Sequence, residues 1–182
     1  MAVAGPVDSV VVVDRRRLEL ADPRIAGSKQ PYHEAEGKQP KEAQRIVERC
    51  TERSRAMARD ALGAVVQDLR HRGHDVVGCG LLLASGRPLP GDVHQILASH
   101  ALIHAAEGEM YRDVLARAGE HLSLLVTGVR ERDLAAHAEK AIGKAAAELQ
   151  RRVAEMGRAV GRPWRQDEKL STLVAWTVLA GA

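Results

Sequence analysis

Short apolar runs, and one short stretch in which apolar and polar residues alternate, predict the strands of the protein. The β-branched run at 10–13 and the alternating residues 18–20 predict two short strands joined by a tight turn. Two more apolar runs, at 75–84 and 121–129, contain or adjoin glycines. Runs of this kind are typical of buried parallel strands, because both faces of such a sheet are covered.

Longer segments follow the helical period of 3.6 residues. Residues 40–72 carry apolar or small side chains at helical spacing, with Pro40 suited to the first turn and Gly73 to the end. The same spacing predicts helices at about 92–119, 131–142, 144–160 and 165–180. Residues 22–40 contain three prolines and two glycines, which predicts a long loop.

Strands and helices therefore alternate through the middle of the chain. Alternation of this kind predicts right-handed crossovers and a largely parallel sheet. A length of 182 residues suits one domain. We therefore expect a single α/β domain over residues 1–182, with the helical part 130–182 packed on the sheet.

The interior must be built from small and branched side chains, because the chain contains no Phe. The aromatic residues are Tyr32, Tyr111, Trp164 and Trp176. Two scattered cysteines, Cys50 and Cys79, are typical of reduced thiols rather than a disulfide framework, so we expect a cytoplasmic protein. No apolar run approaches the roughly 18 residues of a membrane span, so we expect no membrane partner.

The predicted helix at 92–119 carries the most unusual polar residues. A helical wheel started at Ile96 places His100 and Glu107 in the apolar stripe, with His104 and Tyr111 beside them. A buried glutamate needs a partner, and these residues are one turn apart. The pattern is compatible with a polar network between helices, with an acid–base or anion site, or with a divalent metal site. We take His100, His104 and Glu107 as candidate catalytic residues.

Two loops provide candidate ligand-binding residues. Ser85 and Arg87 follow the strand at 75–84, where α/β proteins bind ligands, and an arginine there can hold a phosphate or carboxylate. Tyr32 and His33 lie in the long first loop, which is either a functional loop or a solvated linker. Arg112, on the polar side of the 92–119 helix, completes the candidates.

The charge pattern gives a weaker indication. The net charge is +3, and basic residues gather at the turn 15–17 and in the C-terminal helices. The turn is either a contact for a phosphate backbone or a solvated hairpin turn. No aromatic residues are interleaved with these arginines to stack on bases.

The order of elements also resembles a known group. A first strand ends in Asp14 after an apolar run, and a last helix begins near Asp167 ahead of small apolar residues. In these features the first strand and the chain after residue 40 resemble the RNase H-like superfamily, and in particular its Holliday-junction resolvases. The resemblance implies a three-layer α/β domain with a mixed sheet of about four to five strands flanked by helices.

The resemblance also implies an activity like that of two-metal nucleases, in which clustered carboxylates hold Mg²⁺. If the family's metal ligands are carried over to this chain, Asp14 and Asp167, or Glu168, would be the catalytic metal ligands. The strand at 75–84 has no carboxylate after its first residue, so Glu107 or Glu34 would have to replace the one that the family carries there.

Three functions follow as expectations. The first is a divergent RNase H-like domain that binds nucleic acid, with or without cutting it. The second is an enzyme or binding domain for a small anionic ligand, with His100, His104, Glu107, Arg87 and His33 in a pocket at the strand ends. It requires His33, Arg87 and Glu107 to converge. The third is a non-catalytic scaffold domain, a homodimer through its Ala-rich helices.

Overall fold

The chain folds into two compact, mainly helical units. The computed structural model describes residues 1–86 and 88–182, with 60% in helix and 10% in strand. Unit 1 contains Met1–Arg17, Leu69–Ser85 and Ser123–Ala182. Unit 2 contains Leu18–Asp68 and Gly86–Leu122.

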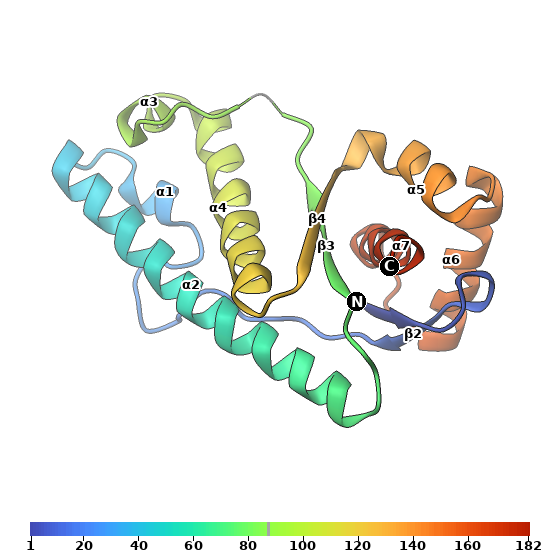
Figure 1. Ribbon diagram of the computed structural model, residues 1–182. Coiled ribbons are helices and arrows are strands. Elements are labelled where there is room, and N and C mark those ends of the chain that lie inside the picture. The colour runs from blue at the N-terminus through green and yellow to red at the C-terminus, as the bar shows by residue number, and fades with distance from the viewer. Residues whose placement is uncertain (87) are drawn as a thin grey trace. The chain divides into compact units, whose positions relative to one another are not determined.

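The described part of unit 2 is helical. Its helices are α1 (Pro31–Ala35), α2 (Pro40–His71), α3 (Val93–Leu97) and α4 (His100–His121) (Figure 1). The last three residues of α2 belong to unit 1. Buried Ala58 on α2 packs with Val114 and Ala118 on α4, and the partly buried Leu20 joins this cluster. Small side chains at this contact let α2 and α4 approach closely.

Unit 1 contains both sheets. The antiparallel sheet pairs β1 (Ala2–Ala4) with β2 (Val11–Asp14), and the parallel sheet pairs β3 (Gly78–Leu83) with β4 (Leu125–Arg130). The parallel register runs from Gly78 opposite Leu125 to Leu83 opposite Arg130. The helices are α5 (Leu134–Ile142), α6 (Ala146–Val160) and α7 (Gln166–Ala180), with 3₁₀ turns at Val7–Ser9 and Glu131–Asp133.

Helix α7 is the centre of unit 1. Trp176 on α7 is 0% exposed, and its indole N–H donates to the carbonyl of Val7 at 3.1 Å. On the side of β3, glycines replace side chains: a Cβ at Gly80 would lie 2.4 Å from Cγ1 of Val174. The helix can therefore lie directly on the strand, which a larger residue at Gly80 would prevent.

The predicted RNase H-like three-layer domain with a mixed sheet of four to five strands is wrong. The described residues form two separate two-stranded sheets with strands of three to six residues. The stretch 18–20 is not a strand, because Leu20 packs on the helices of unit 2 instead. Its predicted place beside β2 is taken by β1, whose residues gave no strong strand pattern.

Other expectations are confirmed. One strand lies within the predicted range 75–84, and a second, β4, begins four residues after the start of the predicted range 121–129 and ends one residue beyond it; the two pair in parallel. The C-terminal helices occur where the 3.6 period places them. The predicted helix at 92–119 is two helices, since the chain leaves the helical path at Ala98 and Ser99.

Candidate metal centre

The first loop of unit 2 is held in place by a carboxylate near its start. Asp22 is 4% exposed and accepts hydrogen bonds from the backbone N–H of Arg24 at 3.0 Å and from its guanidinium at 3.0 and 2.8 Å. It also accepts from Nε of Arg53 on α2, at 2.7 Å. The hydrogen bonds from Arg24, with Arg53 in support, hold the pKa of Asp22 well below its usual range. Residue 22 thus ties the loop to α2.

A second polar contact ties the same loop to α4. The hydroxyl of Tyr111 donates to the carbonyl of Ser28 at 2.8 Å, with the Lys29 carbonyl 3.1 Å away. Burial, together with the charge of Glu107, raises the pKa of Tyr111, so the hydroxyl remains a donor at neutral pH. The chain enters α1 directly after this contact.

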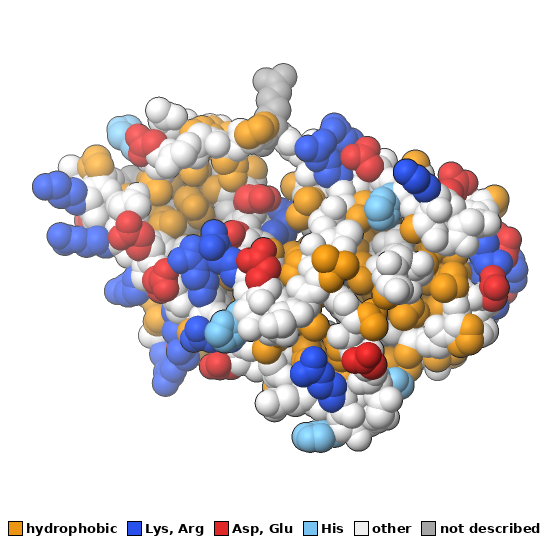
Figure 2. Space-filling view, in the orientation of Figure 1, with side chains coloured by type: hydrophobic (Ala, Val, Ile, Leu, Met, Phe, Trp, Pro, Cys, Tyr) orange, Lys and Arg blue, Asp and Glu red, His pale blue; other side chains and the backbone are white. Residues whose placement is uncertain are grey.

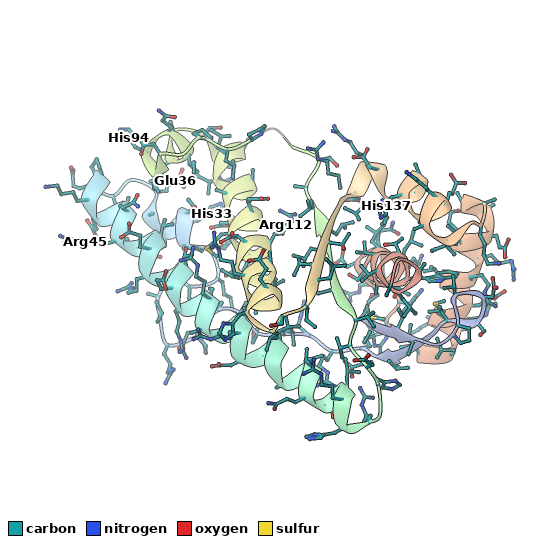
Figure 3. The ribbon with its side chains drawn as sticks, in the orientation of Figure 1. His33, Glu36, Arg45, His94, Arg112 and His137 are labelled. Carbon is teal, nitrogen blue, oxygen red and sulfur yellow. The ribbon has the colours of Figure 1, made fainter. Side chains whose placement is uncertain are left out.

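Helix α1 is too short to be stable alone and is fixed by its neighbours. Pro31 occupies the first turn, where its missing N–H has no cost. Ala35 is 0% exposed and packs with Ala43 and Val47 of α2, and Tyr32 joins the same cluster. These contacts fix the rotation of α1 and direct His33 toward α4, as Figure 3 shows.

His33 and Glu107 form the buried part of the site. One oxygen of Glu107, Oε1, lies 2.9 Å from Nδ1 of His33 and 3.2 Å from the His33 backbone N–H. The side chains are 22% and 9% exposed. A carboxylate can only accept, so Nδ1 carries the proton in this pair. The other ring nitrogen, Nε2, then has its lone pair free in the neutral imidazole.

His100 and His104 form the exposed part of the site. They lie one turn apart on α4, and their Nε2 atoms are 3.1 Å from each other. The ring centre of His33 lies 5.3 Å from that of His100 and 4.6 Å from that of His104. One ligand nitrogen from each of the three histidines lies within 4.8 Å of the others.

This arrangement matches what a zinc ion requires. Zn²⁺ binds imidazole nitrogen at about 2.0–2.1 Å, so three ligating nitrogens end about 3.3 Å apart in a tetrahedral site. Small side-chain rotations would bring the three histidines to that spacing. A carboxylate on the far nitrogen of a metal-binding histidine is the usual outer partner, which fixes the ring and makes it a better ligand. Glu107 already occupies that position on His33.

An open hollow lies beside His33. It has a volume of about 540 Å³ and is lined by His33, Glu34 and residues between Pro23 and Gln30 of the first loop. Gly27 borders it with φ +72°, and a Cβ there would overlap the side chain of Glu34. The hollow therefore lies next to one of the three histidines.

The structure brings together some of the predicted site residues. His100, His104, Glu107 and His33 meet, and the anionic-ligand hypothesis expected His33 and Glu107 to converge in this way. The burial predicted for Glu107 is confirmed, since the residue as a whole is 7% exposed. The burial predicted for His100 is wrong: it is exposed as the first residue of α4, because a helical wheel gives direction but not depth.

The carboxylates carried over from the nuclease resemblance do not join this group. Asp14 accepts two hydrogen bonds of 2.7 Å from Arg16, and Arg72 lies 3.5 Å from it. Asp167 is exposed in the first turn of α7. Among residues 1–86 and 88–182, neither belongs to a set of three possible metal ligands. The carboxylate cluster that would hold Mg²⁺ is therefore not formed by the described residues.

The remaining candidates are not part of the set of three histidines. Ser85 is in unit 1, where its hydroxyl accepts from the backbone N–H of Arg132 at 3.3 Å. Arg112 lies on α4, 3.6 Å from Glu109 (Figure 3). Tyr32 packs in the apolar cluster of α1, and burial raises its pKa. The predicted anion contact at Arg87 lies outside the described residues.

Comparisons with protein-family models, curated proteins and solved structures find no match. Within the described residues, no helix combines the length and apolar character that crossing a bilayer requires.

Proposed function

We propose that this protein binds a zinc ion through His33, His100 and His104, and that the ion activates a water molecule. The observation that carries the proposal is the convergence of three imidazole nitrogens within 4.8 Å, with a carboxylate on the outer nitrogen of one ring. Imidazole is a preferred ligand of Zn²⁺ and of neighbouring transition metals.

The number of protein ligands decides the kind of site. Structural zinc sites have four protein ligands, whereas catalytic sites have three and keep one position for water or substrate. Three histidines leave that position open, and the exposure of His100 and His104 makes it reachable from solvent. A zinc-bound water has a pKa near 7, so it can act as a nucleophile at neutral pH.

Glu107 has the role of a positioning residue. Its contact with Nδ1 of His33 leaves Nε2 as the nitrogen of that ring that can bind the ion. Its negative charge also offsets part of the charge of the ion. The hollow beside His33 is the place for a substrate small enough to enter about 540 Å³.

Metal binding is tested on the full chain after treatment with a chelator. We expect one Zn²⁺ per chain by competition with a chromophoric chelator, and a tetrahedral absorption spectrum when Co²⁺ replaces Zn²⁺. His100→Gln and His104→Gln should each weaken binding by more than the roughly 10- to 100-fold that loss of an outer hydrogen-bond partner costs. Lowering the pH should weaken binding as well, because protons compete for the imidazoles.

A matched control is available on the same helix. His121 is exposed at the last position of α4, so His121→Gln removes an imidazole without touching the site. Equal zinc affinity in the wild type, His104→Gln and His121→Gln would contradict the proposal. Water activation is tested separately, by zinc-dependent hydrolysis of an activated phenyl ester.

A further inference from the structure

A second candidate site lies in unit 1, where two basic segments far apart in the sequence meet. The guanidinium of Arg15 donates from Nη1 to the carbonyls of Gly161, at 3.1 Å, and Pro163, at 2.7 Å. This contact joins the end of β2 to the connection between α6 and α7. Arg16 and Arg17 follow on one side, and Arg162 and Arg165 lie in the other segment.

Positive charge on this surface exceeds negative charge. The basic surface consists of Arg15, Arg16, Arg17, Arg162 and Arg165, and the acidic residues of the same segments are Asp14, Asp167 and Glu168. Asp14 is already bound by Arg16. Glu168 accepts from the backbone N–H of Arg165, as a cap of α7.

Three of these arginines present free cationic groups. Arg17, Arg162 and Arg165 are exposed, and within the described part of the chain none has a carboxylate in ion-pair distance. The Arg15 guanidinium bonds to neutral carbonyls, so its charge is not compensated either. Over α2 in unit 2, by contrast, basic and acidic side chains are interspersed (Figure 2).

An apolar hollow borders the basic surface. It has a volume of about 300 Å³ and is lined by Val11–Asp14 of β2, by Arg15 after it, and by Met156, Ala159 and Val160 of α6. Val11, one of its lining residues, is 55% exposed. Charged groups beside an apolar recess suit a ligand with an anionic backbone and flat apolar faces.

We propose that this surface binds single-stranded nucleic acid, with the arginines on the phosphates and a base in the hollow. Arginine suits phosphate because its planar fork donates two parallel hydrogen bonds. Contacts of this kind are independent of base sequence and depend strongly on salt. The proposal uses residues of unit 1 alone and does not depend on the metal centre.

The test measures fluorescence anisotropy of a labelled mixed-sequence oligonucleotide with the full chain. The double variant Arg17→Gln, Arg162→Gln should bind about tenfold more weakly at low salt. It should also reduce the slope of log affinity against log salt by about 1.4, as two lost phosphate contacts predict for a single strand. Both residues are exposed, and circular dichroism checks that the variant is folded.

The control removes the same charge elsewhere in unit 1. Arg130→Gln, Arg132→Gln alters two exposed arginines at the end of β4 and should leave affinity and slope nearly unchanged. Equal loss in both double variants would overturn the proposal, as would absence of binding at low salt. Equal or tighter binding of a duplex would overturn the assignment to a single strand. Binding to vesicles of anionic lipid, with none to the oligonucleotide, would overturn it in favour of a membrane surface.

Discussion

The two units hold their segments in place by different means. In unit 1, β3 and α7 are joined by apolar packing, with Gly80 on the strand against Val174 and Val178 on the helix. In unit 2, the first loop is joined to the helices by polar contacts, through Asp22, Tyr111 and Glu107. Polar contacts are directional, so they fix side-chain orientation as well as distance. The candidate metal centre lies where orientation is fixed in this way.

The largest expected effect comes from a substitution that disrupts the packing of unit 1. Gly80→Val places a branched side chain where a Cβ already lies 2.4 Å from Val174, so the helix or the strand must move. We expect the free energy of unfolding to fall by roughly 1–3 kcal/mol, the usual cost of overpacking. Thermal unfolding followed by circular dichroism measures it. Gly86→Ala is the control, because nothing lies within 4 Å of its added Cβ.

If the polar contacts of unit 2 are sufficient for the metal centre, Gly80→Val should bind zinc with unchanged affinity at temperatures below its unfolding transition. A variant that is folded but no longer binds zinc would show that the contrast between the units is wrong.

The next effect is on the metal centre itself. Glu107→Gln keeps the size of the side chain but removes its charge, so His33 becomes a poorer ligand. Zinc affinity should fall about 10- to 100-fold, as for other outer carboxylates. Chelator competition measures it, with Glu120→Gln, exposed on the same helix, for comparison. Unchanged affinity would mean that Glu107 has only a structural role.

A smaller effect is expected at Asp22, which joins the first loop to α2. Asp22→Asn leaves Arg24 and Arg53 without their shared carboxylate, so unfolding should occur at a lower temperature at neutral pH. The folded state depresses the pKa of Asp22, so its stabilisation is present above the unfolded pKa, about 3.9, and is lost as the pH falls. The difference between wild type and variant should therefore shrink in acid. A difference that is constant with pH would contradict this account, and Asp60→Asn, exposed on α2, is the matched control.

The smallest effect compares one thiol from each unit. Burial raises the pKa of both Cys50 and Cys79, so both remain mostly protonated and react slowly with alkylating reagents. Cys50 in unit 2 is 1% exposed, whereas Cys79 in unit 1 is partly exposed. Mass spectrometry should find Cys79 labelled first and Cys50 labelled only with unfolding. Labelling in the reverse order would show that the core of unit 2 opens more readily.

The local elements could be predicted from the sequence, and their assembly could not. The 3.6 period identified α2 and the C-terminal helices, because each has an apolar face several turns long. Leu18 to Leu20 alternates like a strand, yet Leu20 is buried against helices, which the period alone does not reveal. The sheets were overestimated because each apolar run was assumed to join one sheet.

The candidate site shows the same limit. His100, His104 and Glu107 share a face of α4 because of their spacing, and the sequence indicated this directly. His33 lies 74 residues from Glu107, in a segment rich in Pro and Gly whose short helix, α1, has no periodic pattern long enough to recognise. The position of His33 depends on the hydrogen bonds of Asp22 and Tyr111. These bonds join residues that are distant in the chain, so no local sequence pattern predicts them.

The scarcity of aromatic residues has a practical consequence for spectroscopy. Both tryptophans, Trp164 and Trp176, belong to unit 1, and both tyrosines, Tyr32 and Tyr111, belong to unit 2. Excitation at the red edge of the absorption band, where only tryptophan absorbs, therefore reports on unit 1 alone. Changes in tyrosine absorbance report on unit 2. The natural chain thus carries a separate optical label in each unit, and its folding can be followed unit by unit without adding a dye.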